Sequence, residues 1–288
     1  MKNAIRLCMG MVLLLIILNP LLFNFNKEDE NNTSDELRGD GCLVLSYHRV
    51  LPSNLPAKLS YSLLKHYTND NELELYSVLG DEFEKQMEYL ISKGVHFATV
   101  EELNSYLKGG KNLPQKSVLI TFDDVDLSVY TNAYPILKHR NIPFVLYVIS
   151  GHAGSKNFNN LKLSTWAQIK EMADSGLADV GSHTHDFHYL GKRKNPPFLD
   201  PDNHMKFFED ISLSIKTIEK ELGIKTNHFS YPYGFGTPQT DDLVLKAGIN
   251  LIFTLKPGVT KRDDPSFFIK RFLVTGTNWS SVVKWVEE

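Results

Sequence analysis

The sequence predicts an α/β protein whose main domain is a single distorted (β/α) barrel of about seven to eight strands. From residue 42 onward, short apolar runs rich in β-branched and aromatic residues alternate with segments of helical periodicity. Histidine and aspartate stand at the C-terminal ends of several of these runs. Repeated alternation of strand and helix favours a parallel sheet, and this many units favours a barrel or something close to one.

Eight segments have the composition of strands: 42–48, 95–100, 117–124, 143–149, 178–183, 228–233, 251–255 and 267–274. Helical periodicity marks 81–94, 129–141, 164–176, 205–223 and 241–248. In the first of these, Phe83, Met87 and Leu90 fall on one helical face, and Gly94 supplies the stop. Residues 51–80 interrupt the alternation, which predicts either a functional loop such as a lid or a surface insertion.

Composition describes an ordinary globular protein. The chain has 288 residues, of which 42% are hydrophobic and 23% charged, enough to bury a sizeable core. Lys+Arg 31 against Asp+Glu 34 leaves a formal net charge of -3, so nucleic acid is not expected as a partner. Of the two cysteines, Cys42 lies in a predicted buried strand and Cys8 lies near the N-terminus, so the domain has no internal disulfide.

The N-terminus has the pattern of an export segment. Lys2 and Arg6 precede an apolar run over 7–23, as in a signal peptide. No small-residue cleavage site follows the run, which is about long enough to span a bilayer. Residues 1–26 are therefore interpreted as either a signal peptide or an N-terminal membrane anchor. The basic residues place the rest of the chain outside the cell.

Two further segments complete the predicted organisation. Residues 27–41 are charged and polar, and we interpret them as a flexible tether. Residues 42–288 form the globular domain. Localisation is therefore expected to be extracellular, with the protein secreted or anchored at the bacterial cell surface.

Three histidines stand close together in "GSHTHDFHYL", at His183, His185 and His188. They belong either to a polar surface turn or to a metal site. Asp123 and Asp124 end the predicted strand "SVLITFDD". Loops that follow the strands of a parallel barrel converge at one face, so these side chains are expected to meet. One carboxylate with two imidazoles makes a three-ligand catalytic metal site, although Asp124 as a simple turn cap remains an alternative.

Four motifs together carry a family resemblance. "SYHRV", "TFDD", "SHTHDFH" and "YPYG" occur in this order, each at the end of a predicted strand. The chain resembles the polysaccharide deacetylases, the NodB-type carbohydrate esterases, over roughly residues 42–275. Within that family it is most similar to the biofilm poly-β-1,6-N-acetylglucosamine deacetylases of the intercellular adhesion type. The resemblance implies the NodB homology fold for the globular domain.

The resemblance also implies roles for the acids and histidines. Asp123 corresponds to the catalytic base, and Asp124, His183 and His188 correspond to the metal ligands. His185 is left as a bystander or a supporting group. A set of two histidines and one aspartate favours zinc as the divalent metal, with cobalt, nickel and iron left open. Such a cation lowers the pKa of its water from 15.7 to about 7, and the spare carboxylate can then take the proton.

His48 and Tyr233 receive roles by the same resemblance, and Arg271 receives one from the order of the predicted strands. His48 corresponds to the acid that protonates the departing amine, with a core or capping histidine as the alternative. Tyr233 corresponds to the residue whose backbone N–H holds the oxyanion. Ser230 stands where the family has an arginine that orients the base, and Arg271 on the last predicted strand is the proposed replacement.

The function implied is a metal-dependent hydrolase. It would remove N-acetyl groups from poly-β-1,6-N-acetyl-D-glucosamine and release acetate during maturation of a biofilm exopolysaccharide. The protein is expected to act as a monomer at the cell membrane or cell surface. Peptidoglycan or chitin oligosaccharides are alternative substrates, and a catalytically inactive glycan-binding or adhesion protein is the alternative of a different class.

Overall fold

The computed structural model describes residues 37–54, 75–192 and 194–288. The chain divides into two units, Met1–Asp35 and Glu36–Glu288, and every described residue belongs to the second. The predicted signal or anchor segment, 1–26, lies outside the described residues, and the domain boundaries stay predictions. None of the helices among the described residues combines the length and apolar character needed to cross a membrane.

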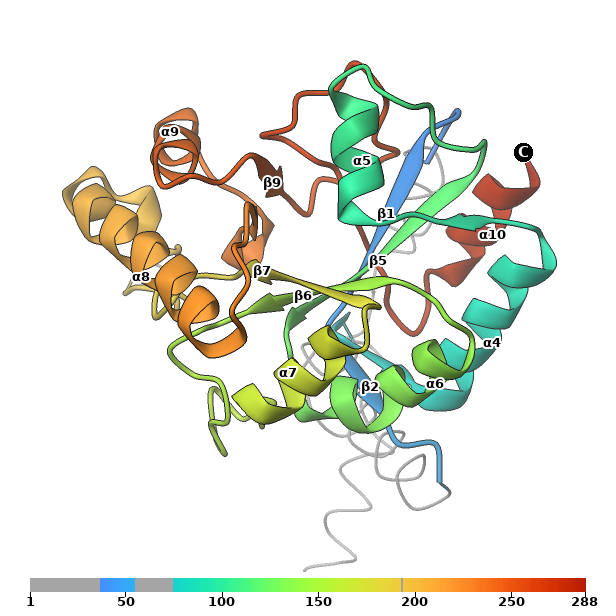
Figure 1. Cartoon of the computed structure of the whole chain (residues 1–288), viewed down its shortest axis with the longest axis horizontal. Coiled ribbons are helices and arrows are strands. Elements are labelled where there is room, and N and C mark those ends of the chain that lie inside the picture. Colours follow the sequence, from blue (N-terminus) through green and yellow to red (C-terminus); the bar gives the residue numbers. More distant parts are fainter. Residues whose placement is uncertain (1–36, 55–74, 193) are drawn as a thin grey trace, which may run out of the picture. The chain divides into compact units, whose positions relative to one another are not determined.

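A curled parallel sheet forms the centre of the second unit (Figure 1). Its strands are β1 (Cys42–Tyr47), β4 (His96–Phe97), β5 (Ser117–Asp124), β6 (Phe144–Val148), β7 (Ala178–Ser182), β8 (His228–Ser230), β9 (Leu251–Phe253) and β10 (Phe272–Leu273). The order is β10-β1-β5-β6-β7-β8-β9, and β4 pairs with β5 outside this path. Every one of these pairs is parallel. The predicted α/β barrel fold is therefore confirmed.

The segment 266–273 contacts both β9 and β1, the strands between which the barrel closes. The N–H of Ile252 in β9 donates to the Ser266 carbonyl at 2.9 Å, and the N–H of Arg271 donates to the Lys256 carbonyl at 3.0 Å. The next residues form β10, which pairs with β1. Because the chain changes partner at Arg271, only Phe272–Leu273 of the strand predicted over 267–274 is regular, and the barrel closes irregularly.

Two other regions differ from the predicted elements. The strand predicted over 95–100 is reduced to β4, because Val100 already begins a helix. That helix has a capping box, in which Thr99 Oγ1 accepts from the Glu102 N–H at 3.2 Å and Glu102 Oε2 accepts from the Thr99 N–H at 2.9 Å. The described part of the predicted irregular region contains a second, two-stranded parallel sheet of β2 (Arg49–Leu51) and β3 (Ser77–Leu79).

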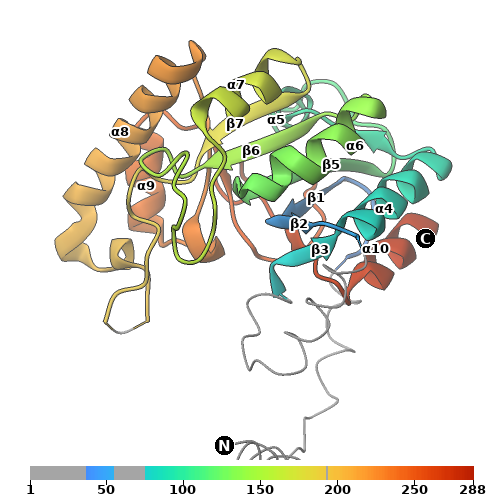
Figure 2. The same cartoon turned by 90° about the horizontal axis from the view of Figure 1, so that it is seen from below.

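Helices cover the outside of the sheet. They are α4 (Gly80–Ser92), α5 (Val100–Leu107), α6 (Tyr134–His139), α7 (Trp166–Asp174), α8 (His204–Leu222), α9 (Pro238–Lys246) and α10 (Trp279–Glu287). Short helical turns, η1 (Val129–Ala133), η2 (Pro197–Leu199), η3 (Pro201–Asn203) and η4 (Pro232–Gly234), complete the set. Figure 2 shows α4, α6 and α7 side by side along the outer face of the strands, with α8 and α9 next to one another beyond them.

Buried residues are apolar beneath the helices and partly polar inside the barrel. Phe83, Met87 and Leu90 of α4 are fully buried, as the helical spacing predicts. Inside the barrel, however, Thr121 and Arg271 are also fully buried. Polar groups at this depth need partners, so part of the barrel interior, beneath the ends of the strands, is hydrogen-bonded.

Candidate active site

The ends of four strands meet around a cavity of about 520 Å³. Its lining includes six of the predicted site residues, namely His48, Asp123, Asp124, His183, His188 and Tyr233. They follow or end β1, β5, β7 and β8. Arg271, the seventh, is fully buried and contacts Asp123. The structure therefore brings all seven predicted residues together.

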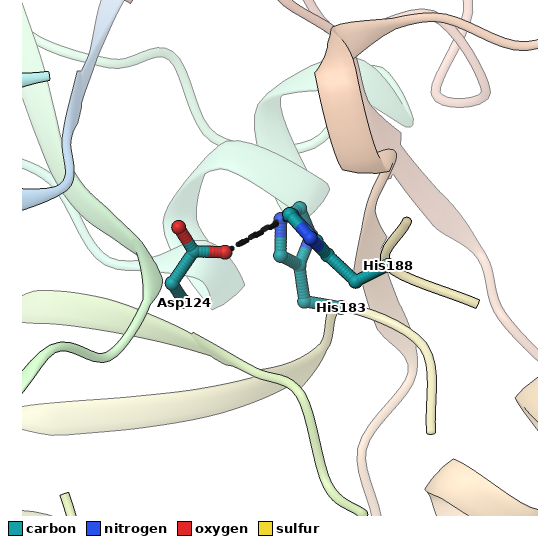
Figure 3. A group of neighbouring side chains, drawn as sticks. All are labelled: Asp124, His183 and His188. Carbon is teal, nitrogen blue, oxygen red and sulfur yellow. Dashed lines mark ion pairs between the residues drawn. The ribbon is translucent and has the colours of Figure 1, made fainter. Parts of the chain in front are cut away.

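Asp124, His183 and His188 form a group able to hold a metal ion. Each offers one ligand atom, and these atoms all lie within 4.8 Å of one another. Asp124 Oδ1 is 3.1 Å from His188 Nε2 and 3.5 Å from His183 Nε2. Figure 3 shows the carboxylate of Asp124 directed toward both imidazole rings. Two nitrogens and one oxygen leave coordination positions open, as in catalytic zinc sites.

The surroundings of these three side chains also suit a cation. Asp124 is buried, and its Oδ1 lies within ion-pair distance of Nε2 of both imidazoles. His183 Nδ1 lies 2.7 Å from the carbonyl oxygen of Ser230, which can only accept, so Nδ1 carries the proton. The lone pair of His183 Nε2 therefore faces Asp124, which is how a metal-binding histidine is usually oriented.

Burial and charge set the protonation of this group. Burial lowers the pKa of His183 to about 4, so its imidazole is neutral at physiological pH. Burial also disfavours a charge on His188, but the Asp124 carboxylate outweighs this and raises the pKa of His188 above its usual value. The two histidines outweigh burial at Asp124 and hold its pKa well below the usual range. A bound cation would replace the proton that His188 takes up.

The backbone at the end of β5 directs the two neighbouring carboxylates to different partners. Asp124 and Val125 both have left-handed φ, at 62° and 59°, which is rare for a β-branched residue such as Val125. The N–H of Val125 donates to the Asp123 carbonyl at 2.7 Å and closes this turn. Asp123 thereby meets Arg271, and Asp124 meets the histidines. Backbone strain of this kind is common at functional sites.

Asp123 is held in a buried, hydrogen-bonded position. Arg271 donates from Nη1 to Asp123 Oδ1 at 2.7 Å and from Nη2 to Asp123 Oδ2 at 2.8 Å. Arg271 Nη2 also donates to Ser230 Oγ at 2.7 Å, and Ser230 Oγ donates to Asp123 Oδ2 at 3.3 Å. Although burial opposes it, the Arg271 charge lowers the pKa of Asp123, so this carboxyl is ionised.

His48 and Tyr233 line the same cavity as the two carboxylates. His48 Nε2 is 3.9 Å from Asp123 Oδ2, and the His48 ring lies 4.6 Å from that of Tyr76. Burial lowers the pKa of His48, so the imidazole is neutral in the resting protein. Tyr233 has a left-handed φ of 61°, and its ring lies 5.0 Å from the His188 ring.

Sequence reasoning missed part of the pocket wall. Tyr76, Phe158, Tyr189 and Leu190 also line the cavity. Tyr189 and Leu190 directly follow the histidine motif, whereas Tyr76 and Phe158 lie in segments without a recognisable motif. The remaining histidine of the trio, His185, is not part of the metal-binding group. Its Nδ1 lies 2.9 Å from Ser150 Oγ, in the loop after β6.

Comparison with known proteins places the chain among polysaccharide deacetylases. Residues 110–252 match the sequence model of that family. The poly-β-1,6-N-acetyl-D-glucosamine N-deacetylase of Staphylococcus aureus is 32% identical over 259 residues, covering 90% of this chain and 87% of that protein. The Staphylococcus epidermidis protein of the same name is 33% identical over 274 residues, covering 95% and 93%. IcaB from Ammonifex degensii, a solved structure, matches with a TM-score of 0.77 and 42% identity, covering 88% of this chain and all of that one.

These matches extend over nearly the whole length of each relative. The family-model match includes the strand ends that carry Asp123, Asp124, His183 and His188, because 110–252 spans β5 to β8. The predicted family and the predicted class of enzyme, an N-deacetylase, are confirmed by these relatives. The chain belongs to the polysaccharide deacetylase family.

Proposed function

We propose that the protein is a metal-dependent hydrolase that removes N-acetyl groups from poly-β-1,6-N-acetyl-D-glucosamine. Acetate would be released while a biofilm exopolysaccharide matures. The observation that carries this proposal is the arrangement of two ionised aspartates at one strand end, with Asp123 held by Arg271 and Asp124 facing two imidazoles. The two staphylococcal relatives, which are named for this polymer, support the choice of substrate.

Asp124, His183 and His188 are the proposed metal ligands. A divalent cation held there would polarise the acetamide carbonyl and supply a water whose pKa falls from 15.7 to about 7. The mixed nitrogen and oxygen donors favour zinc, and cobalt, nickel and iron suit the same set. The neutral state of His183 and the position of Asp124 Oδ1 beside both imidazoles support this assignment.

Asp123 is the proposed general base. Its ionised carboxylate would accept a proton from the attacking water as the oxygen adds to the acetamide carbon. Arg271 would fix the carboxylate by its paired hydrogen bonds and keep it charged. The carbonyl oxygen becomes an oxyanion, which the backbone N–H of Tyr233 would stabilise.

His48 is the proposed acid. When the C–N bond breaks, the amine nitrogen needs a proton, because an amide nitrogen leaves poorly without one. The His48 imidazole is neutral at rest, so it must receive that proton during the reaction. Asp123, which holds the proton from water, is 3.9 Å from His48 Nε2 and is the nearest source. The products are acetate and a glucosamine unit.

The proposed location at the cell surface is supported by the N-terminal sequence. Lys2, Arg6 and the apolar run over 7–23 support export, with the segment either cleaved or kept as a membrane anchor. The enzyme would then act as a monomer on polymer at the bacterial cell surface. The aromatic side chains of Tyr76, Phe158 and Tyr189 along the cavity support a sugar chain as the ligand, because their rings can pack on apolar faces.

Acetate release tests this proposal. The full chain, supplied with zinc, is incubated with a β-1,6-linked N-acetylglucosamine pentamer and, separately, with the β-1,4-linked chitin pentamer. Release from the β-1,6 pentamer that chelator abolishes is the expected result. Faster release from the β-1,4 pentamer would contradict the proposed substrate but would still support N-deacetylation as the reaction. Binding of either pentamer without release would favour a glycan-binding protein.

A further inference from the structure

The loop that carries both imidazoles is held from behind by a carboxylate of α8. Asp210 Oδ1 accepts a hydrogen bond from the N–H of His185, and Asp210 Oδ2 accepts one from the N–H of Asp186, both at 2.7 Å. These two N–H groups stand midway between His183 and His188. Asp210 therefore binds the centre of the loop and touches neither imidazole.

A second residue of α8 holds the same loop. Ser214 follows Asp210 by four residues, so both face the loop from one side of the helix. The Ser214 hydroxyl lies 2.7 Å from Ser182 Oγ and 3.3 Å from the carbonyl oxygen of Thr184. Thr184 has a left-handed φ of 74°, which a threonine adopts only when its surroundings hold it there. The contacts with α8 thus span the loop from Ser182 to Asp186.

Burial of the Asp210 carboxylate on the apolar face of α8 is energetically unfavourable. Asp210 lies on the buried face of α8 with Phe207 and Ile211, and it is only 8% exposed. Burial raises the pKa of Asp210 to about 6, so the group is ionised at neutral pH but less favourably than in water. An apolar residue would pack on this face without that cost. The two carboxylate oxygens of Asp210 instead accept the two hydrogen bonds from the loop.

We propose that Asp210 is a positioning residue for the metal site. Its two hydrogen bonds fix the backbone between His183 and His188, and this sets the separation of their Nε2 atoms from Asp124 Oδ1. Residues that orient metal ligands typically change metal affinity by roughly 10–100-fold when they are substituted. This inference rests on the proposed metal ligands, and it adds to them a residue outside the cavity.

The test compares Asp210→Asn with Glu209→Gln in the full chain. Asparagine keeps one acceptor oxygen and turns an NH₂ group toward the other N–H, so it loses one loop hydrogen bond. Glu209 is the adjacent, exposed residue of α8, and its substitution makes the same change in charge. For each protein, the zinc Kd is measured by competition with a chelator, and the Tm is measured without metal.

We expect Asp210→Asn to weaken zinc binding roughly 10–100-fold while the metal-free protein stays folded at the assay temperature. Glu209→Gln should bind as the wild type does. A zinc Kd for Asp210→Asn equal to that of the wild type would overturn this role and leave the proposed function intact. If the wild type itself bound no zinc, the proposed metal site would fall, and this role with it.

A second variant keeps the test decisive if Asp210→Asn does not fold. If Asp210→Asn is unfolded at the assay temperature, Asp210→Glu is measured in the same way. Glutamate keeps the charge and both acceptor oxygens but is one methylene longer, so it displaces the loop. Weaker zinc binding by Asp210→Glu supports the positioning role, and an unchanged Kd contradicts it.

Discussion

Arg271 donates one hydrogen bond to each carboxylate oxygen of Asp123, at 2.7 and 2.8 Å, and both side chains are buried. The two residues come from distant parts of the sequence. They meet because Arg271 directly precedes β10, which pairs with β1, and β1 in turn pairs with β5, where Asp123 lies. The pair keeps Asp123 ionised beside the candidate metal ligands.

Substitution of Arg271 by methionine should strongly destabilise the protein. Removing one member of a buried ion pair leaves the other charge unpaired, which typically costs about 3–5 kcal/mol. Urea denaturation of Arg271→Met, Asp123→Asn and the double variant measures this. The double variant should be more stable than Arg271→Met alone, because no buried carboxylate then lacks its partner. Simple addition of the two single effects would show that the pair is not coupled.

Substitution of His48 by glutamine should lower the rate of acetate release without changing the affinity for zinc. Loss of a general acid typically lowers the rate by about 10²–10⁴-fold, and we expect kcat for acetate release to fall within that range. The zinc Kd should stay at the wild-type value, because His48 is not one of the three proposed ligands. Full activity in His48→Gln would contradict the role of His48 as the acid and would favour a structural role for this histidine.

Zinc affinity should weaken as the pH falls, starting above pH 6.5. A metal ligand must be deprotonated, and the Asp124 carboxylate raises the pKa of His188 above the usual imidazole value. His183, with a pKa of about 4, contributes only at much lower pH. Zinc Kd values between pH 5 and 8 measure the dependence, with the exposed His139→Gln as a control. A constant Kd from pH 8 to 6 would contradict it.

Asp210 should make the metal-free protein less stable as the pH rises from 4 to 7. Its pKa of about 6 in the folded protein is above the usual value, so the folded state binds more protons over this interval. The free energy of unfolding then decreases with rising pH. Relative to Asp210→Asn, the wild type should lose stability between pH 4 and 7 in urea denaturation. The same difference at both pH values would show that Asp210 titrates normally.

The sequence predicts the site better than it predicts the elements around it. His48, Asp123, Asp124 and His183 stand at or directly after the ends of strands, so the convergence of parallel strands is enough to bring them together. The strand predicted over 267–274 is mostly irregular, because that segment pairs first with β9 and then with β1. Periodicity cannot show such a change of partner, since it reports only which face is buried.

Asp210 shows what kind of residue sequence reasoning misses. No motif surrounds it, and its partners are backbone N–H groups whose positions depend on the folded loop. One signal is present in hindsight. Asp210 and Ser214 share the apolar face of α8 with Phe207, Ile211 and Ile218, and an acid within such a face needs a buried partner.

The role of Asp123 is tested most directly by acetate release from Asp123→Asn beside the wild type, with bound zinc measured in the same samples. Both proteins should hold zinc, because Asp123 is not one of the three proposed ligands. Only the wild type should release acetate from the β-1,6-linked pentamer at an appreciable rate, since the variant lacks the proposed base. Equal rates from the two zinc-loaded proteins would contradict the central claim that Asp123 activates the attacking water.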